Sequence, residues 1–284
     1  MATEGRPSTR RDWRTFGKAL VRAPLLRRIV LVAGVLGGLF LALTLSRVWG
    51  LIDTRLWNLL SPILASGATN TFLFSAAIIP VGAVIGFLVG WARVSRHPIV
   101  SWPATVFVDL VRGIPQLVLI LFAFFWLPYV FEIQGSLDAG LDFAVLALAI
   151  HTGAYQAEIF RAGFQSVPRG QIEAAEALGL SKGRVMTSVV LPQTFRVTLP
   201  ALGNEFALIV KDSSLLAAIG AQELVYWGRN SAQFALTVYA QIGWVATTWL
   251  IIAMLYFAIT YLITQVVGSL EHHYRVPGLG SVAF

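Results

Sequence analysis

Long apolar runs alternate with short polar segments along most of the chain. The first run begins at residue 29, and the others lie at about 68–92, 104–130, 141–164, 190–218 and 241–268. A helix needs about 20 consecutive apolar residues to cross the hydrocarbon core of a bilayer. The pattern therefore predicts an all-α fold, a polytopic membrane helix bundle with about six transmembrane helices. Prolines inside two of the runs predict kinks, at Pro115 and Pro128 and at Pro192 and Pro200.

Composition agrees with a membrane protein. Of the 284 residues, 57% are hydrophobic and 12% are charged, and the mean hydropathy is +0.73, whereas soluble domains carry about 25% charged residues. A net charge of +7 would suggest nucleic acid in a soluble protein, but the basic residues lie at the edges of apolar runs, where they orient the chain. We expect no nucleic-acid partner. The absence of cysteine excludes disulfides, thiol catalysis and thiolate metal sites.

The N-terminal part divides into a basic leader and a hydrophobic helix. Residues 1–28 are polar and basic, and we expect them in the cytoplasm, free or on anionic headgroups. Residues 29–48 fit an uncleaved transmembrane helix better than a signal peptide, because the leader is long and SRVWG is a poor cleavage site. Residues 49–66 are expected to form a short interfacial segment.

The distribution of charge predicts how the bundle is oriented. The basic residues between the runs fall on one side of a six-helix arrangement, whereas the loop at 131–142 on the other side holds three acidic residues and no Lys or Arg. The positive-inside rule then places both termini in the cytoplasm, including a tail at 269–284. Residues 219–240 are amphipathic and are expected on the outer face or as a re-entrant segment.

A segment of mixed polarity, Gln171–Pro192, interrupts the apolar pattern. Gln171 to Leu178 favour a helix, Gly179 can supply the left-handed residue that ends it, and Ser181 can cap a second helix. The predicted orientation puts this segment in the cytoplasm. It either binds a soluble partner or forms a surface helix without one, and the residues alone leave both possibilities open.

Three sequence blocks, in this order and spacing, resemble permeases of the polar amino acid uptake family of ABC importers. They are RGIPQLVLILFAFF at 112–125, HTGAYQAEIFRAGFQSVPRGQIEAAEALGLS at 151–181 and LPQTFRVTLPALGNEFALIVKDSSLLAAIG at 191–220. The resemblance extends over residues 67–268. It implies a type I importer fold in which a five-helix core follows the N-terminal helix, located in a prokaryotic cytoplasmic (inner) membrane.

The same resemblance implies partners and a coupling loop at 168–192. The expected complex holds two ABC ATPase subunits that bind ATP and Mg, a second permease that is identical or homologous, and an extracytoplasmic substrate-binding protein. The EAA residues of the family carry over to the residues that would dock on the ATPase, namely Glu173, Ala174, Ala175, Gly179 and Pro192. The chain departs from the family pattern at Ile114, where threonine is usual, and at His151, where asparagine is usual.

Candidates for the translocation path are polar residues inside the apolar runs. His151, Tyr155 and Glu158 are spaced i, i+4 and i+7, so they share one helix face. Glu205 interrupts the next run, and intramembrane ionisable groups usually face a bundle interior or a wet cavity. These residues either meet the polar ends of an amino acid or stabilise the bundle, for example through a pair between Glu158 and Arg161.

Motifs for catalysis do not occur in the chain. It has no G-x-x-x-x-G-K-[ST] phosphate loop, no zinc-hydrolase spacing and no G-x-S-x-G elbow. We therefore expect a subunit without catalytic residues, cofactor or metal, whose ATP hydrolysis is supplied by a separate polypeptide. The predicted function is that of a permease for a polar or basic amino acid. The alternatives are a permease for another small solute, a secondary transporter or a channel.

Overall fold

The computed structural model describes residues 33–34, 36–38, 54–133, 137–240 and 242–274. The chain divides into two units, Met1–Asp53 and Thr54–Phe284, and the fold given below is that of the second unit. The predicted leader at 1–28 and most of the predicted helix at 29–48 lie outside the described residues. Of the predicted tail at 269–284, the first six residues continue the last helix, which ends at Tyr274.

The described part of the second unit is helical and contains no strand, which confirms the all-α prediction. Its elements in chain order are α3 (Thr54–Arg93), α4 (Pro98–Gly113), α5 (Gln116–Val130), α6 (Leu137–Gln165), α7 (Arg169–Ala177), α8 (Lys182–Val185), the π-helical η2 (Met186–Val190), α9 (Leu191–Asp212), the 3-10 helix η3 (Ser213–Ile219), α10 (Leu224–Tyr239) and α11 (Ile242–Tyr274).

Three of these helices, α3, α6 and α11, are long and apolar enough to cross a membrane. A fourth span results if α4 and α5 count together, although they are bent by 98° with respect to each other. Residues 104–130 were predicted to be one kinked span, and the structure breaks this run between Gly113 and Gln116. The reason is local, because Pro115 cannot donate a backbone hydrogen bond and holds Ile114 in an extended conformation. Helix α9 has 22 residues, but several are charged, and it is not among the helices that are apolar enough to cross a membrane.

Residues 49–66 were expected to form a short segment separate from the run at 68–92, but residues 54–66 are continuous with that run. Residues 54–66 form the first turns of α3, and Pro62 lies inside the helix. Leu60 and Leu64, one turn apart, are 3% and 2% exposed, and this half of α3 packs against α10. The packing of these two leucines explains why the helix continues through polar residues that the sequence pattern placed at the membrane surface.

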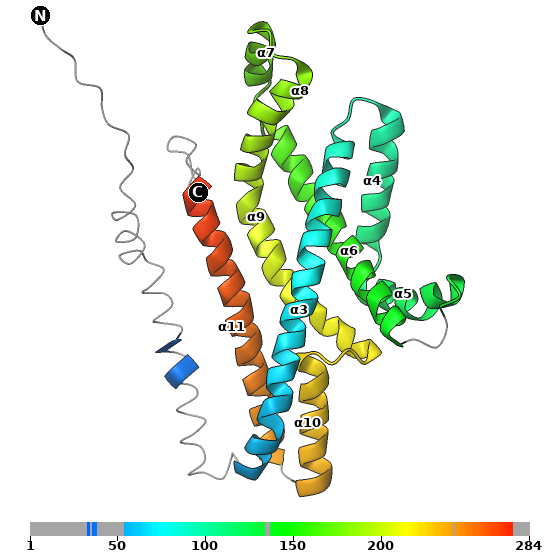
Figure 1. Ribbon diagram of the computed structural model, residues 1–284, viewed down its shortest axis with the longest axis vertical. Helices are drawn as coiled ribbons and strands as arrows, with labels where there is room; N and C mark the ends of the chain where they lie inside the picture. Colours follow the sequence, from blue (N-terminus) through cyan, green and yellow to red (C-terminus); the bar gives the residue numbers. More distant parts are fainter. Residues whose placement is uncertain (1–32, 35, 39–53, 134–136, 241, 275–284) are drawn as a thin grey trace, which may run out of the picture. The chain divides into compact units, whose positions relative to one another are not determined.

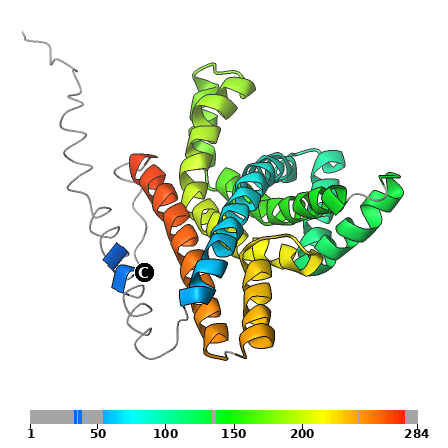
Figure 2. The same ribbon diagram turned by 60° about the horizontal axis from the view of Figure 1, so that its bottom comes forward.

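Helix α3 runs the length of the unit, with α6 and α4 on one side and α9 and α11 on the other (Figure 1). Helix α10 lies beside the first half of α3 and the start of α11, and α7 and α8 form the opposite tip of the molecule (Figures 1 and 2). The segment with α7 and α8 therefore lies at the same end of the bundle as the last turn of α3 and the last turn of α6.

Glycines allow α3 and α6 to approach closely. A β-carbon at Gly86 would lie 2.5 Å from the β-carbon of Gln156, and one at Gly90 would lie 2.7 Å from the carbonyl oxygen of Ala157. Small residues at such spacing let helix backbones approach in membranes, where lipid provides no hydrophobic drive for association. Among the described helices, α3 and α6 share the most extensive contact.

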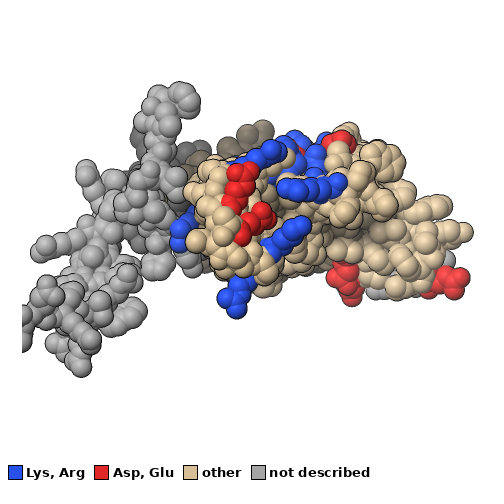
Figure 3. All heavy atoms as spheres, turned by 90° about the horizontal axis from the view of Figure 1, so that it is seen from above, with Lys and Arg blue, Asp and Glu red and all other residues tan. Residues whose placement is uncertain are grey.

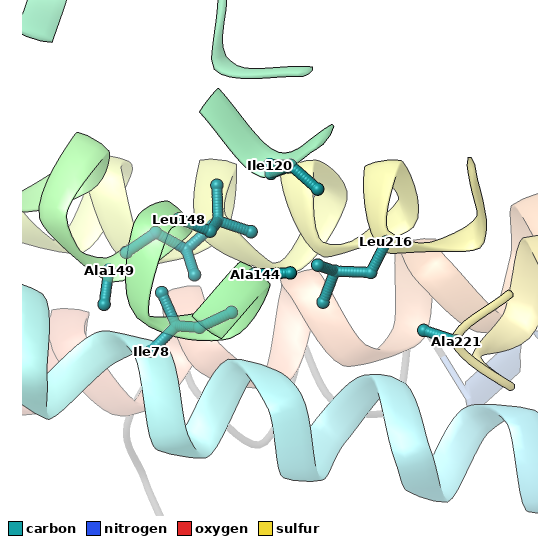
Figure 4. Close-up of a cluster of buried hydrophobic side chains, with 8 residues drawn as sticks. Ile78, Ile120, Ala144, Leu148, Ala149, Leu216 and Ala221 are labelled. Atoms are coloured by element: carbon teal, nitrogen blue, oxygen red, sulfur yellow. The ribbon is translucent and has the colours of Figure 1, made fainter. Parts of the chain in front are cut away.

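A buried apolar cluster holds the middle of the bundle together. It contains Ile78 of α3, Ile120 of α5, Leu148 of α6, Ile209 of α9 and Leu216 of η3, together with three small alanines. Figure 4 shows these side chains converging from α3, α5, α6 and η3. The cluster fixes the start of α5 and the end of α9 against α6, and these are the segments that border the site described below.

A buried carboxyl group joins α3, α10 and α11. Glu223 is fully buried and caps α10 by accepting hydrogen bonds from the backbone N–H groups of Val225 and Tyr226, at 2.9 and 2.7 Å. It also accepts a hydrogen bond from the phenol of Tyr256 in α11, at 2.6 Å. The backbone N–H of Leu224 donates to Thr71 of α3 at 3.2 Å. Three helices are thus tied at the start of α10.

Candidate functional site

The break between α4 and α5 borders a cavity of about 440 Å³ that charged and apolar residues line together. Gly113 ends α4, and α5 begins after Pro115, so the wall at this point is irregular backbone. Non-helical backbone at membrane depth is tolerated where it is buried in protein or lines a wet cavity. The lining residues are Arg112, Gly113, Ile114, Pro115, Gln116, His151, Tyr155, Glu205, Leu208 and Asp212.

One wall of the cavity is a stack of three side chains. His151 and Tyr155 project from the same face of α6, as predicted from their spacing, and their ring centroids are 5.1 Å apart. The guanidinium of Arg112 lies 4.9 Å from the centroid of the Tyr155 ring. A cation–π contact of this kind orients the guanidinium, although Arg112 as a residue is exposed. The stack therefore presents a positioned cation to the cavity.

Helix α9 also lines the cavity and contributes its two acidic residues. Glu205, Leu208 and Asp212 follow one another at helical spacing and all line the cavity. The carboxyl group of Asp212 is hydrogen-bonded to the side chain of Gln116 at the start of α5. The cavity lining thus contains one guanidinium and two carboxyl groups. This arrangement can hold a small molecule that carries a carboxylate and an ammonium group.

Glu158 lies elsewhere, although it was grouped with His151 and Tyr155 from the sequence. Its carboxylate forms ion pairs with Arg93 of α3 and Arg161 of α6, and it is not among the residues that line the cavity. The pair between Glu158 and Arg161 was the structural alternative for this residue. Of the four predicted path residues, the structure brings together His151, Tyr155 and Glu205.

The residues assigned to the coupling loop lie at the tip formed by α7 and α8. Glu173 and Ala174 are exposed, while Ala175 is buried against α6 and the π-helical segment. Gly179 has a φ of 82° and ends α7 in the left-handed conformation, as predicted. Pro192 is the second residue of α9, which continues from the π-helical η2 without a break in the helical backbone.

Several lining residues were not in the predicted site. Arg112 and Gln116 flank the break, and Asp212 ends α9. The available signal was the sequence Arg112-Gly-Ile-Pro-Gln116, in which polar residues surround a glycine and a proline inside an apolar run. At the tip, Leu178 is 84% exposed beside Gly179 and is a further large side chain that a docking partner could contact.

Charged side chains concentrate at the end of the bundle that carries α7 and α8. Seen from this end, Lys and Arg side chains surround a smaller group of acidic side chains (Figure 3). They include the exposed residues Arg96, Arg169, Lys182 and Arg184. This end has the charge that the positive-inside rule assigns to the cytoplasmic side.

Known proteins share this architecture. The family described as "Binding-protein-dependent transport system inner membrane component" matches residues 78–275. The glutamine transport system permease protein GlnP of Escherichia coli (strain K12) is 34% identical over 221 residues, which cover 76% of this chain and 94% of that protein. The probable amino-acid ABC transporter permease protein YckA of Bacillus subtilis (strain 168) is 32% identical over 213 residues, covering 75% of this chain and 89% of YckA.

A solved structure agrees with these matches. The crystal structure of an amino acid ABC transporter with histidines contains a chain that is 30% identical, with a TM-score of 0.65, and the match covers 78% of this chain and 99% of that one. Identity at this level over nearly the whole of each relative extends well beyond a shared fold. The chain therefore belongs to the family of binding-protein-dependent transport system inner membrane components and is a permease of the ABC importer type.

Proposed function

We propose that this chain is the transmembrane subunit of an ATP-driven amino acid importer and that the cavity beside the α4–α5 break is part of its translocation path. The observation that carries the proposal is that one guanidinium, of Arg112, and two carboxyl groups, of Glu205 and Asp212, line the same cavity. A volume of about 440 Å³ falls within the range of about 300–1,000 Å³ that is usual for small-molecule sites.

The charges in the cavity favour a polar or basic amino acid. Arg112 can bind the α-carboxylate through a charge-assisted pair, and one acidic residue can bind the α-ammonium group. The second acidic residue then remains for a polar or cationic side chain. The names of the similar proteins point to the same class, since they mention glutamine in one case and histidines in another.

The chain contributes the path and the coupling, and the proposed ATPase subunits bind ATP and Mg. Glu173, Ala174 and Leu178 project from the tip and are exposed, so they are available to dock on an ATPase. The assembly would hold two ATPases, a second permease and an extracytoplasmic binding protein in a cytoplasmic (inner) membrane, with both termini of this chain in the cytoplasm. The positive charge at the tip supports this orientation.

Uptake by the reconstituted complex tests the proposal. Liposomes containing the chain, its ATPase and its binding protein should take up a polar or basic amino acid only with ATP present. Glu205→Gln should lower substrate-stimulated ATPase activity and uptake while the complex still assembles. If no amino acid is transported, or if Arg112→Ala and Glu205→Gln both leave the transport kinetics unchanged, the proposed path is wrong.

Capture of the ATPase tests the coupling surface separately. Glu173→Arg reverses a charge on the exposed face of α7 and should weaken co-purification of the ATPase with the tagged chain. Glu205→Gln serves as the control, because it lies in the cavity and should leave capture intact. Equal capture of the ATPase by both variants would show that Glu173 is not part of the coupling surface.

A further inference from the structure

The last turn of α3 and the last turns of α6 are joined by a charged cluster. The carboxylate of Glu158 pairs with the guanidinium groups of Arg93 and Arg161 at once. Arg161 also donates a hydrogen bond to the side chain of Gln165, at 2.7 Å. The side chains of Arg93 and Glu158 are 11% and 32% exposed, so the pair between α3 and α6 is largely shielded from water.

This charged cluster lies where three helices are already in close contact. Gly90, which allows α3 and α6 to touch, is one turn before Arg93. The ring of Phe87 packs edge-on against Phe160 at 5.4 Å and stacks on Phe195 of α9 at 5.6 Å. Ion pairs and aromatic contacts therefore hold α3 against α6 over the same stretch.

The coupling segment packs directly on the end of α6 that carries this cluster. Phe164 and Val167 belong to a buried cluster with Ala175 of α7 and Val185 of α8. A displacement of α7 and α8 would thus act first on the last turns of α6. Arg161 and Glu158 lie within two turns of Phe164 on that helix. The ion pair between Glu158 and Arg93 is the charged link from this part of α6 to α3.

We propose that Arg93, Glu158 and Arg161 are positioning residues that make α3 and α6 move as one body when an ATPase displaces the coupling segment. The inference rests on the proposed function and adds a link that the cavity and the docking surface do not contain. Packed helices that move as rigid bodies transmit small displacements over long distances. Without the carboxylate, Arg93 would keep a shielded charge with no anion beside it, and the end of α3 would be free to separate from α6.

The ratio of substrate transported to ATP hydrolysed distinguishes this role from a general loss of stability. Glu158→Gln and Arg93→Gln should each lower that ratio by about fivefold or more, the lower end of usual coupling effects, in complexes that still assemble and hydrolyse ATP. Arg96→Gln is the matched control, because it removes the same charge from an exposed position three residues beyond Arg93. An unchanged ratio in Glu158→Gln would overturn the proposal.

A covalent cross-link between α3 and α6 tests whether the two helices move together. Because the chain contains no cysteine, introduced cysteines are its only thiols. The double variant Arg93→Cys with Glu158→Cys should react with a short bifunctional thiosulfonate, in a complex whose partners lack reactive thiols. If α3 and α6 move as one body, cross-linking should raise the transport ratio of the double variant toward the wild-type value. Single-cysteine variants treated in the same way control for modification alone.

The remaining outcomes also decide the question. Uptake that stops on cross-linking would show that α3 and α6 must separate during transport, and a double variant that does not cross-link would show that the two positions are not adjacent. Either result overturns the inference. A wild-type complex that transports no amino acid would instead contradict the proposed function.

Discussion

Removing one hydroxyl group from α11 should measurably destabilise the bundle. In Tyr256→Phe, the ring remains, and the hydroxyl group that donates to the buried carboxyl group of Glu223, 2.6 Å away, and that also hydrogen-bonds Thr71 is lost. A hydrogen bond to a charged group contributes about 1.5–3 kcal/mol in soluble proteins, but pairs inside membrane bundles average about 0.6 kcal/mol, with a maximum near 1.7. Glu223 is fully buried and keeps only its two capping bonds. We therefore expect a loss of about 1–1.7 kcal/mol, in the upper part of the membrane range.

Equilibrium unfolding of the purified chain in mixed detergent micelles measures this loss. The matched control is Tyr261→Phe, which removes the same hydroxyl group five residues further along α11, where the Tyr261 ring stacks on Phe257 at 5.9 Å. The control should change the free energy of unfolding by a few tenths of a kcal/mol at most, which is the usual scale for sites without a special feature (about 0.5 kcal/mol).

A double-mutant cycle assigns the effect to the contact itself. Combining Tyr256→Phe with Glu223→Ala should cost less than the sum of the two single losses, by about 1 kcal/mol, because both variants remove the same hydrogen bond. Strict additivity, or equal losses in Tyr256→Phe and Tyr261→Phe, would refute the reasoning. The start of α10 would then be held by its capping bonds and by Thr71 alone.

Three further expectations concern the tip and the helix contacts. Glu173→Arg should reduce ATPase-dependent uptake in proportion to the lost ATPase capture, and uptake that persists without capture would contradict docking at this residue. Gly86→Ala should destabilise the bundle by about 1–3 kcal/mol through overpacking, because the new β-carbon would lie 2.5 Å from the β-carbon of Gln156 in α6. Gly170→Ala should not destabilise the bundle, because the space around Gly170 is open. Gly179→Ala should strain a left-handed turn (φ 82°) by about 1–2 kcal/mol, measured as faster proteolysis of the tip, whereas Gly183→Ala should leave proteolysis unchanged.

Much of the helical architecture could be predicted because hydrophobic periodicity and helix-breaking glycines and prolines are local signals. The end of α7 at Gly179 follows from one residue that tolerates a positive φ. The bend between α4 and α5 is different. Pro115 predicted a kink, but hydropathy is continuous through both half-helices, and a proline can give either a kinked span or a broken one. Packing of α5 against α6 and η3 decides between the two.

The site could be predicted only in part, because residues on the same face of a helix can lie at different levels along its axis. His151, Tyr155 and Glu158 do follow one face of α6, but Glu158 lies seven residues beyond His151, which is about 10 Å along the helix axis. That distance carries Glu158 past the cavity to the level of Arg93. No local pattern shows that the end of α3 lies at this level, so the ion pair between them depends on tertiary packing.

The acidic residues at membrane depth are therefore stabilised in different ways, and this separates their roles. Glu158 is paired with two arginines, and Glu223 accepts hydrogen bonds from two backbone N–H groups and a phenol, and neither residue lines the cavity. Among the four acidic residues compared, only Glu205 and Asp212 border a space that a solute can enter. If the proposed path is correct, Glu205→Gln should change which amino acids compete for uptake and leave the ratio of transport to ATP hydrolysis unchanged, whereas Glu158→Gln should change that ratio and leave the preference unchanged. If each variant altered both the amino acid preference and the ratio of transport to ATP hydrolysis, binding and coupling would share one network. The separation of Glu158 from the cavity would then have no functional meaning.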